Sequence, residues 1–352
     1  MTRLRMAVIG CGHLGTIHAR LLAARGDVEL VAVVDPVVES RARVAEAHGC
    51  RPLAAPGELV GLVDAVVVAA PTGLHAAVSL PLLAAGIDLL VEKPLAATVE
   101  DARAIAIAAR RHGRTVAVGH VERFNPAWRA VAARAGGATL VEAARVAPFS
   151  FRSLDVGVVH DLMIHDIDLV LSLEPGRLDR VEARGLVATG GHEDVVRARL
   201  SFASGLVADL TASRISPTAS RTFAMWCPDG VVTVDFNARS VTTLAPSAGV
   251  RDGSYVAAQV PVDERPAARE RFFADVLPLA QATVGEANAI AAEHDDFVAA
   301  VRSGRPPLVS AAAGAAAVEI AARVLDALEC GRLGGGRTAT ATIPMIPRRK
   351  TG

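Results

Sequence analysis

Short apolar runs rich in valine alternate with longer segments of helical periodicity through the first third of the chain. The short runs predict strands because they are nearly continuous and bounded by glycine or charged residues. The longer segments repeat apolar residues at helical spacing and predict amphipathic helices. The strands are expected at residues 6–9, 28–34, 65–69, 89–91 and 115–118, and the helices at 14–24, 38–48, 75–85 and 99–111. This alternation predicts an α/β fold with a doubly wound parallel sheet that is buried on both faces.

The second half of the chain shows strict alternation of apolar and polar residues instead of continuous apolar runs. Residues 195–202 are an example, with arginines at 197 and 199 between apolar neighbours. Such strands have one buried and one polar face, which predicts a large, mainly antiparallel sheet in an α+β domain, with helices on one face. The strands are expected at 140–146, 181–187, 195–202, 206–212, 222–226, 231–235 and 256–260, and the helices at 125–134, 159–173, 287–302 and 311–328.

The alternation of strand and helix stops in the segment Gly119–Pro126, which carries charges and a turn signal. We therefore expect a nucleotide-binding domain over residues 1–121 and a substrate-binding and oligomerisation domain over residues 122–340. Residues 341–352 form a tail in this division.

Composition excludes several classes of protein. The 352 residues carry 37 basic and 37 acidic side chains, so the formal charge is zero and nucleic acid is not an expected partner. The uncharged stretch between Asp64 and Asp88 is interrupted by Pro71, Thr72 and Gly73, so a strand, turn and buried helix are expected there and no membrane span. The four cysteines have no CxxC spacing, which argues against a zinc module and favours the reducing cytoplasm.

Lysine is almost absent from the chain. Only Lys93 and Lys350 are lysines, and Lys350 lies in the basic tail, so Lys93 is the single internal one. A chain that uses arginine for its other basic positions suggests that Lys93 has a role that a guanidinium cannot fill. Chance retention is the alternative interpretation.

A glycine-rich turn follows the first predicted strand. Residues Gly10, Gly12 and Gly15 fit the pattern GxGxxG, with His13 and Leu14 between them, and Asp35 ends the second strand. In a Rossmann fold these glycines permit a tight turn, close approach of a pyrophosphate and close packing of helix on strand. The acid would bind the adenosine ribose and repel a 2′-phosphate, which predicts NAD rather than NADP unless Arg41 compensates. A glycine turn without a ligand is the alternative.

Two further turns fall at carboxyl ends of predicted strands, where dinucleotides bind. Pro71 and Thr72 follow one strand, and His75 opens the next helix, where it either lines the cofactor crevice or caps the turn. Glu92 and Lys93 precede Pro94, which favours an extended backbone that points Lys93 into the crevice. Lys93 is expected to contact the cofactor and to bind and deprotonate a substrate hydroxyl, with Glu92 as its anchor or as a plain surface acid.

The segment 160–168 holds the densest group of titratable residues. At helical spacing Asp161, His165 and Asp168 share one face, so His165 is a plausible general base that a carboxylate orients. Acids that simply complement the helix dipole are an equal alternative. A zinc or manganese site is a third interpretation, but no HExxH pattern appears and we predict no metal.

These motifs together resemble the Gfo/Idh/MocA family of oxidoreductases over nearly the whole chain. The resemblance rests on the GxGxxG turn, Glu92-Lys93-Pro94, the pair Asp161 and His165, and the segment 293–310. It implies an NAD(P)-dependent dehydrogenase of a sugar or cyclitol. In this family pattern Lys93 and His165 are catalytic, and Asp161 positions the substrate or the histidine.

Within that family, residues 118–126 and 161–168 are most similar to the nucleotide-sugar dehydrogenases that oxidise the 3-hydroxyl of UDP-N-acetylglucosamine. Arg123 and Asn125 follow the last strand of the parallel sheet and are expected to bind diphosphate or sugar hydroxyls. An interdomain salt bridge is the alternative for Arg123.

Other functions stay open at this point. The same chemistry on a free sugar, inositol or another polyol is one alternative, and a non-catalytic NAD-binding redox sensor is another. A metal-dependent lyase or hydrolase built on the segment 160–168 is a third. An open sheet with helices on one side also leaves a broad face, which predicts a homodimer or homotetramer.

Overall fold

The computed structural model describes residues 2–134, 136–154 and 156–332, so the predicted tail and Lys350 lie outside the described residues. The chain forms two compact units, each built from several segments. The first unit runs from the N-terminus to residue 129 and adds 167–171 and 285–322. Of the described residues, the second unit contains 130–134, 136–154, 156–166, 172–284 and 323–332. The division into continuous domains at residue 121 stays a prediction.

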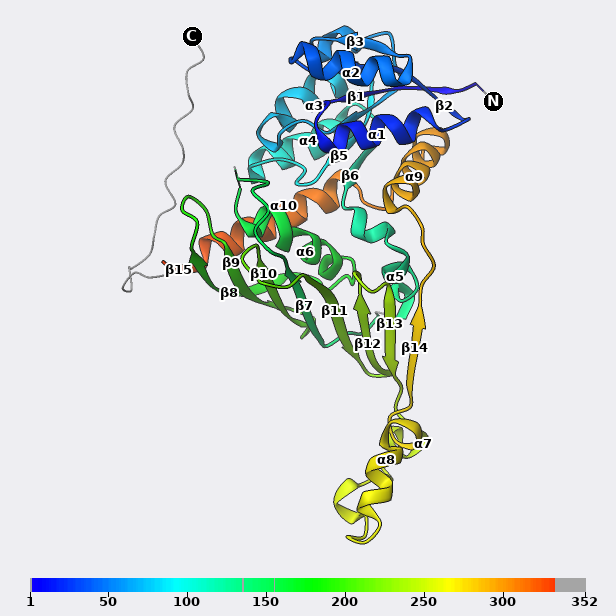
Figure 1. Cartoon of the computed structure of the whole chain (residues 1–352), viewed down its shortest axis with the longest axis vertical. Helices are drawn as coiled ribbons and strands as arrows, with labels where there is room; N and C mark the ends of the chain where they lie inside the picture. Colours follow the sequence, from blue (N-terminus) through cyan, green and yellow to red (C-terminus); the bar gives the residue numbers. More distant parts are fainter. Residues whose placement is uncertain (1, 135, 155, 333–352) are drawn as a thin grey trace. The chain divides into compact units, whose positions relative to one another are not determined.

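The first unit is built on a six-stranded parallel sheet in the order β3-β2-β1-β4-β5-β6 (Figure 1). The order reverses between β1 and β4, which is the switch point where doubly wound sheets bind ligands. The predicted doubly wound fold is therefore confirmed. The strands are β1 (Leu4–Ile9), β2 (Val28–Val34), β3 (Arg51–Leu53), β4 (Ala65–Val68), β5 (Asp88–Glu92) and β6 (Val116–Gly119).

Local sequence explains where the helices of this unit begin and end. Thr98 caps its helix by accepting a hydrogen bond from Asp101 N (3.1 Å), and Asn288 does the same for Ala291 N (3.1 Å). Gly49 and Gly304 end two helices in the left-handed conformation, with φ of 65° and 71°. The helices are α1 (His13–Ala23), α2 (Val38–His48), α3 (His75–Ala84), α4 (Val99–Arg111), α5 (Pro126–Arg129), α9 (Ala289–Ser303) and most of α10 (Ala311–Asp326).

The second unit contains a nine-stranded sheet in the order β14-β13-β12-β11-β7-β10-β9-β8-β15. Neighbouring strands are antiparallel except for the pairs β7–β10 and β8–β15, so the predicted mainly antiparallel sheet is confirmed. Burial alternates along β9, as the sequence predicted. The strands are β7 (Leu140–Val146), β8 (Leu178–Val187), β9 (Val195–Phe202), β10 (Val207–Ser213), β11 (Ser220–Cys227), β12 (Gly230–Asp235), β13 (Ser240–Leu244), β14 (Leu279–Thr283) and β15 (Leu328–Arg332).

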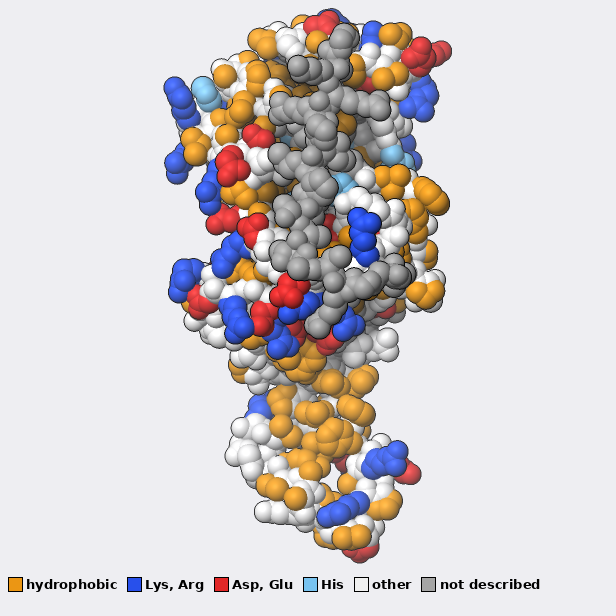
Figure 2. Space-filling model, turned by 90° about the vertical axis from the view of Figure 1, so that its left-hand side faces the viewer, with side chains coloured by type: hydrophobic (Ala, Val, Ile, Leu, Met, Phe, Trp, Pro, Cys, Tyr) orange, Lys and Arg blue, Asp and Glu red, His pale blue; other side chains and the backbone are white. Residues whose placement is uncertain are grey.

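An excursion over residues 245–278 connects β13 to β14 and extends beyond the end of these strands (Figure 1). It contains α7 (Ala248–Arg251) and α8 (Arg265–Asp275), neither of which has a buried residue. Apolar side chains cover much of this segment in Figure 2. Within it, Val262 is 75% exposed and Phe273 is 54% exposed. The strand predicted at 256–260 is wrong, because this segment forms a 3-10 turn, η6 (Ala257–Gln259), and pairs with no strand of the described sheets.

None of the helices among the described residues combines the length and the apolar character that crossing a bilayer requires.

Candidate active site

The glycine turn has the geometry that a dinucleotide needs. Gly10 has a φ of 94°, and a Cβ on Gly15 would lie 1.7 Å from the carbonyl oxygen of Gly10. A Cβ on Gly12, in contrast, would meet no atom within 4 Å. Packing therefore requires Gly10 and Gly15, whereas Gly12 keeps space open at the start of α1.

The backbone amides at the N-terminus of α1 carry the partial positive charge that binds phosphate. His13 and Leu14 form the first turn of α1 and are exposed there. Thr16 Oγ1 donates to Gly12 O at 2.8 Å and fixes the turn. The open space over Gly12 leaves room for a pyrophosphate, and the contact of these residues with a cofactor stays a prediction.

Asp35 lies beside this turn at the end of β2. Its carboxylate accepts hydrogen bonds from Cys11 N and Val37 N, both at 2.8 Å. A carboxylate has about four acceptor sites, so it retains capacity for ribose hydroxyls. Arg41 Nη1 donates to the carbonyl oxygens of Asp35 (3.1 Å) and Pro36 (3.0 Å), so a guanidinium does lie near the acid.

The turn after β4 is held by His75. Pro71 precedes the 3-10 turn η2 (Thr72–Leu74), and both Pro71 and Thr72 are at least partly exposed. The His75 side chain is buried, with Nδ1 at 2.9 Å from Pro94 O and Nε2 at 2.8 Å from Ala70 O. His75 thus links this turn to the loop that follows Lys93, and its contact with the cofactor stays a prediction.

Lys93 is half-buried at the end of β5, and its peptide bond to Pro94 is cis. The preceding Glu92 is 9% exposed, and its Oε2 accepts a hydrogen bond from Lys93 N at 3.3 Å. Glu92 Oε1 lies 2.7 Å from Nε2 of the buried His18, a contact that sequence reasoning missed.

A second group of charges lies in the first unit around the segment after β6. Arg123 Nη1 is 3.7 Å from Asp168 Oδ1, and neither Asp168 oxygen accepts a hydrogen bond within the described residues. His120 is fully buried, and this burial lowers its pKa against the opposing effect of Asp168. Both partners of the ion pair belong to the same compact unit. From the sequence, no role was predicted for His120, which follows the glycine that ends β6.

The side chain of Asn125 forms hydrogen bonds with its own neighbouring residues. Its Nδ2 donates to Glu122 Oε2 and its Oδ1 accepts from Ala127 N, both at 3.0 Å. Asn125 therefore holds the start of α5. One amide N–H and one acceptor site of Oδ1 remain, and its role in substrate binding stays a prediction.

The segment that carries Asp161 and His165 differs from the regular helix that was predicted over 159–173. Residues Val159–Met163 form a π-helical turn, η5, and α6 (Ile164–Leu171) follows it. The common face predicted for Asp161 and His165 assumed α-helical spacing, and that assumption is wrong for the first turn. Both side chains are half-buried in the second unit.

Two buried charged groups support this π-helical turn. Asp166 forms an ion pair with Arg145 of β7 at 2.9 Å, with both side chains almost fully buried. Glu193 Oε1 accepts a hydrogen bond from Val159 N at 3.1 Å, and burial raises the pKa of Glu193. Sequence reasoning did not assign Arg145 or Glu193, because their partners lie 21 and 34 positions away.

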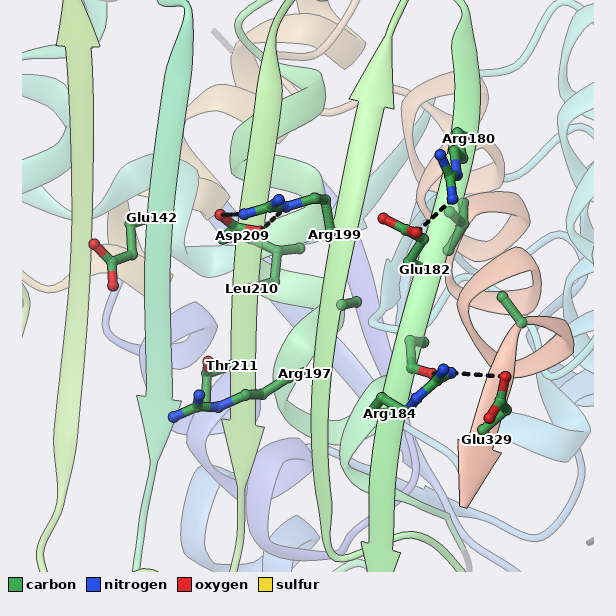
Figure 3. Close-up of a pocket in the computed structure, with 14 residues that line it drawn as sticks. Glu142, Arg180, Glu182, Arg184, Arg197, Arg199, Asp209, Leu210, Thr211 and Glu329 are labelled. Carbon is green, nitrogen blue, oxygen red and sulfur yellow. Dashed lines mark hydrogen bonds and ion pairs between the residues drawn. The ribbon is translucent and has the colours of Figure 1, made fainter. Parts of the chain in front are cut away.

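One face of the nine-stranded sheet carries arginine, glutamate and aspartate side chains (Figure 3). It surrounds a hollow of about 860 Å³ that β7, β8, β9, β10 and β15 line. Three ion pairs line it: Arg180–Glu182 within β8, Arg184–Glu329 between β8 and β15, and Arg199–Asp209 between β9 and β10, at 2.6, 2.8 and 2.7 Å. We call this surface, together with Glu142 and Arg197, the charged sheet face.

Across residues 2–134, 136–154 and 156–332, no three His, Cys, Asp or Glu side chains are grouped so that they could hold a metal ion.

Comparison with known proteins agrees with this geometry. Residues 4–120 match the family described as an oxidoreductase family with an NAD-binding Rossmann fold, and residues 114–233 match the GFO/IDH/MocA C-terminal domain. The UDP-N-acetylglucosamine 3-dehydrogenase of Acidithiobacillus ferrooxidans is 34% identical over 94% of this chain and 98% of its own length. A solved structure of that enzyme has a TM-score of 0.81 at 32% identity, with 93% of this chain and 98% of that chain covered.

A more distant relative is the NAD(+)-dependent scyllo-inositol 2-dehydrogenase of Bacillus subtilis, 30% identical over 61% of this chain and 68% of its own length. The fold, the glycine turn and the internal lysine define an NAD(P)-binding oxidoreductase. More particularly, the chain belongs to the Gfo/Idh/MocA oxidoreductase family.

Proposed function

We propose that the protein is an NAD-dependent dehydrogenase that oxidises the 3-hydroxyl of a UDP-N-acetylhexosamine. The observation that supports this substrate most is the similarity to the Acidithiobacillus ferrooxidans enzyme, which extends over 94% of the chain and is not confined to the nucleotide-binding part. Asp35 at the ribose position supports NAD, because its carboxylate would repel the 2′-phosphate of NADP.

In this proposal the residues of the chain bind, orient and exchange protons. Gly10, Gly12 and Gly15 with the amides of His13 and Leu14 hold the pyrophosphate, and Asp35 holds the ribose. Pro71, Thr72 and His75 with Glu92 and Lys93 line the crevice. Bound NAD supplies the hydride acceptor.

Lys93 hydrogen-bonds the substrate hydroxyl, and Lys93 or His165 takes its proton as the carbonyl forms. Asp161 orients His165 or the substrate, and Arg123 with Asn125 binds diphosphate or sugar hydroxyls, the planar guanidinium being suited to phosphate. The cytoplasm stays the proposed location; the four cysteines are free in the described structure.

The test is turnover of a defined panel: UDP-N-acetylglucosamine, UDP-glucose, free N-acetylglucosamine and myo-inositol, each with NAD and with a 2-oxo acid that recycles any bound NADH. We expect a product that has lost two hydrogens from the UDP-N-acetylhexosamine, and none with Lys93→Met. Oxidation of inositol or a free sugar alone would keep the chemistry and refute this substrate. Tight NAD binding without any turnover would favour the redox sensor.

We also propose that two copies of the chain associate through the charged sheet face. Glu142 and Arg197 are the members of this face that form no ion pair within the described residues. They stand on β7 and β9, separated by β10. A twofold axis would place Arg197 of each copy opposite Glu142 of the other, as an isologous contact requires.

Charge reversal tests this interface. Arg197→Glu should shift the protein to a smaller species in sedimentation velocity, and the double variant Arg197→Glu, Glu142→Arg should restore the assembly. Arg110→Glu, an exposed change on α4, is the matched control. A monomeric wild-type protein, or an assembly that Arg197→Glu leaves unchanged, would refute the proposal.

A further inference from the structure

A chain of hydrogen bonds runs through the interior of the first unit behind Lys93. His18 of α1 lies between two partners, with Nδ1 at 2.7 Å from His294 Nε2 and Nε2 at 2.7 Å from Glu92 Oε1. His18 and His294 are at most 1% exposed, and Glu92 is 9% exposed. These hydrogen bonds therefore connect α9 through α1 to the end of β5, where Lys93 begins the next loop.

The protonation of this chain follows from its geometry. Burial lowers the pKa of His294 to about 3, with the charges of His18 and Arg25 adding to the effect, so His294 is neutral near pH 7. A neutral imidazole carries one N–H. His294 Nδ1 has no hydrogen-bond partner in the described structure, so an N–H there would be a buried and unsatisfied donor.

The proton of His294 is therefore on Nε2, which donates to His18 Nδ1. That leaves His18 Nε2–H to donate to Glu92 Oε1. Each link fixes the tautomer of the next, in the way that a second hydrogen bond normally sets which imidazole nitrogen acts. Both hydrogen bonds therefore donate in the same direction, from His294 to His18 and from His18 to Glu92.

Other contacts keep both ends of this chain in place. Arg25 at the end of α1 forms an ion pair with Asp295 at 2.5 Å, and Arg302 donates to Asp27 O at 2.7 Å, which fixes α9 against α1. At the opposite end, a Cβ on Gly119 of β6 would lie 2.9 Å from Glu92 Oε2. The Glu92 carboxylate therefore has one defined place, and its Oε2 accepts from Lys93 N.

We propose that His18 and His294 are positioning residues for Lys93 and act through the Glu92 carboxylate. The proposal rests on the proposed catalytic role of Lys93. His294 fixes the tautomer of His18, His18 fixes Glu92, and Glu92 holds the backbone amide from which the lysine side chain projects. A displacement of about 1 Å at a catalytic group lowers a rate by on the order of a hundredfold, so a chain outside the crevice has a measurable effect.

The lysine content of the protein allows a direct test. Protein labelled with ¹⁵N-lysine gives backbone amide signals from Lys93 and Lys350 alone, and Lys350→Arg assigns them. His294→Phe keeps a ring of similar size and removes the donor, whereas His294→Gln places an amide N–H near the position of Nε2. Val298→Ala, a buried change on the same helix, controls for loss of stability.

We expect His294→Phe to move the Lys93 amide signal and to lower kcat about tenfold to a hundredfold. His294→Gln should restore both, and Val298→Ala should change neither. A Lys93 signal and a kcat that stay at wild-type values in His294→Phe would overturn the proposal. If His294→Phe does not fold, His294→Leu, which also removes the donor and is smaller than phenylalanine, gives the same two measurements.

The amide signal needs no substrate, so it is informative even if the proposed function fails. If the wild type shows no activity on the proposed substrate but His294→Phe still displaces the Lys93 signal, the proposed substrate is refuted and the positioning role of the histidines is supported.

Discussion

The glycine turn offers a prediction in which two neighbouring substitutions separate binding from folding. Gly12 and Gly15 both belong to the GxGxxG turn, but their surroundings differ. A Cβ at position 15 would lie 1.7 Å from Gly10 O, whereas a Cβ at position 12 would meet no atom within 4 Å. Gly12→Ala should therefore harm cofactor binding alone, and Gly15→Ala should harm the fold.

The magnitudes follow from these distances. Gly12 has φ of −73° and ψ of −162°, which alanine adopts without strain, so Gly12→Ala loses only the N-cap preference, roughly 0.5 kcal/mol. That corresponds to a fall in Tm of about 1–2 °C. Gly15→Ala pushes the backbone at residues 10 and 15 apart. This overpacking should lower the free energy of unfolding by about 1–3 kcal/mol or more, which corresponds to a fall in Tm of roughly 3–10 °C.

Two assays distinguish the variants. Calorimetric melting without cofactor measures the fold, and titration with NAD measures binding. We expect Gly12→Ala to melt close to wild type but to raise the Kd for NAD at least about tenfold, equivalent to ~1.4 kcal/mol, because the methyl group takes the place of the pyrophosphate. Wild-type NAD affinity in Gly12→Ala would refute the placement of the pyrophosphate over that residue.

Three further predictions concern other parts of the molecule. Asp35→Ser should weaken NAD binding and strengthen NADP binding in calorimetric titrations, and an unchanged preference would contradict the ribose contact. Asp166→Asn removes the carboxylate partner of the buried Arg145 and should lower the free energy of unfolding by about 3–5 kcal/mol in urea titrations; a loss within experimental error would disprove the importance of this pair. Burial raises the pKa of Glu293, so the folded state retains a proton that the unfolded state releases as the pH rises above the ordinary value of 4.5. The free energy of unfolding should fall with rising pH through that range, and Glu293→Gln should flatten this decline; equal slopes for both proteins would show that the carboxyl is not protonated.

Local periodicity predicted most of the fold. The parallel sheet was predictable because its strands are continuous apolar runs, and β9 because burial alternates along it. The strand β3 was missed because Arg51-Pro52-Leu53 is short, contains a proline, is mostly exposed and pairs only with the end of β2. Residues 256–260 have strand-like alternation but no partner strand among the described sheets, so the strand predicted from the pattern does not form.

The candidate site was predictable where it depends on contiguous motifs and not where it depends on distant pairs. The glycine turn and Lys93 each lie in a short recognisable segment. His18 lies 74 positions from Glu92 and 276 positions from His294 in the sequence, and the residues around each histidine do not predict these contacts. The π-helical turn at Val159–Met163 also escaped prediction, and the carboxylate that accepts from its first amide, Glu193, lies 34 positions away.

The central claim is that hydride leaves carbon 3 of a UDP-N-acetylhexosamine for bound NAD, with Lys93 in contact with the reacting hydroxyl. The most direct measurement uses UDP-N-acetylglucosamine that carries deuterium at carbon 3 and follows the label by mass spectrometry and NMR. We predict deuterium at carbon 4 of the nicotinamide, with transfer abolished in Lys93→Met. Deuterium that stays on the sugar while NADH forms from another position, or equal transfer in Lys93→Met, would contradict the account.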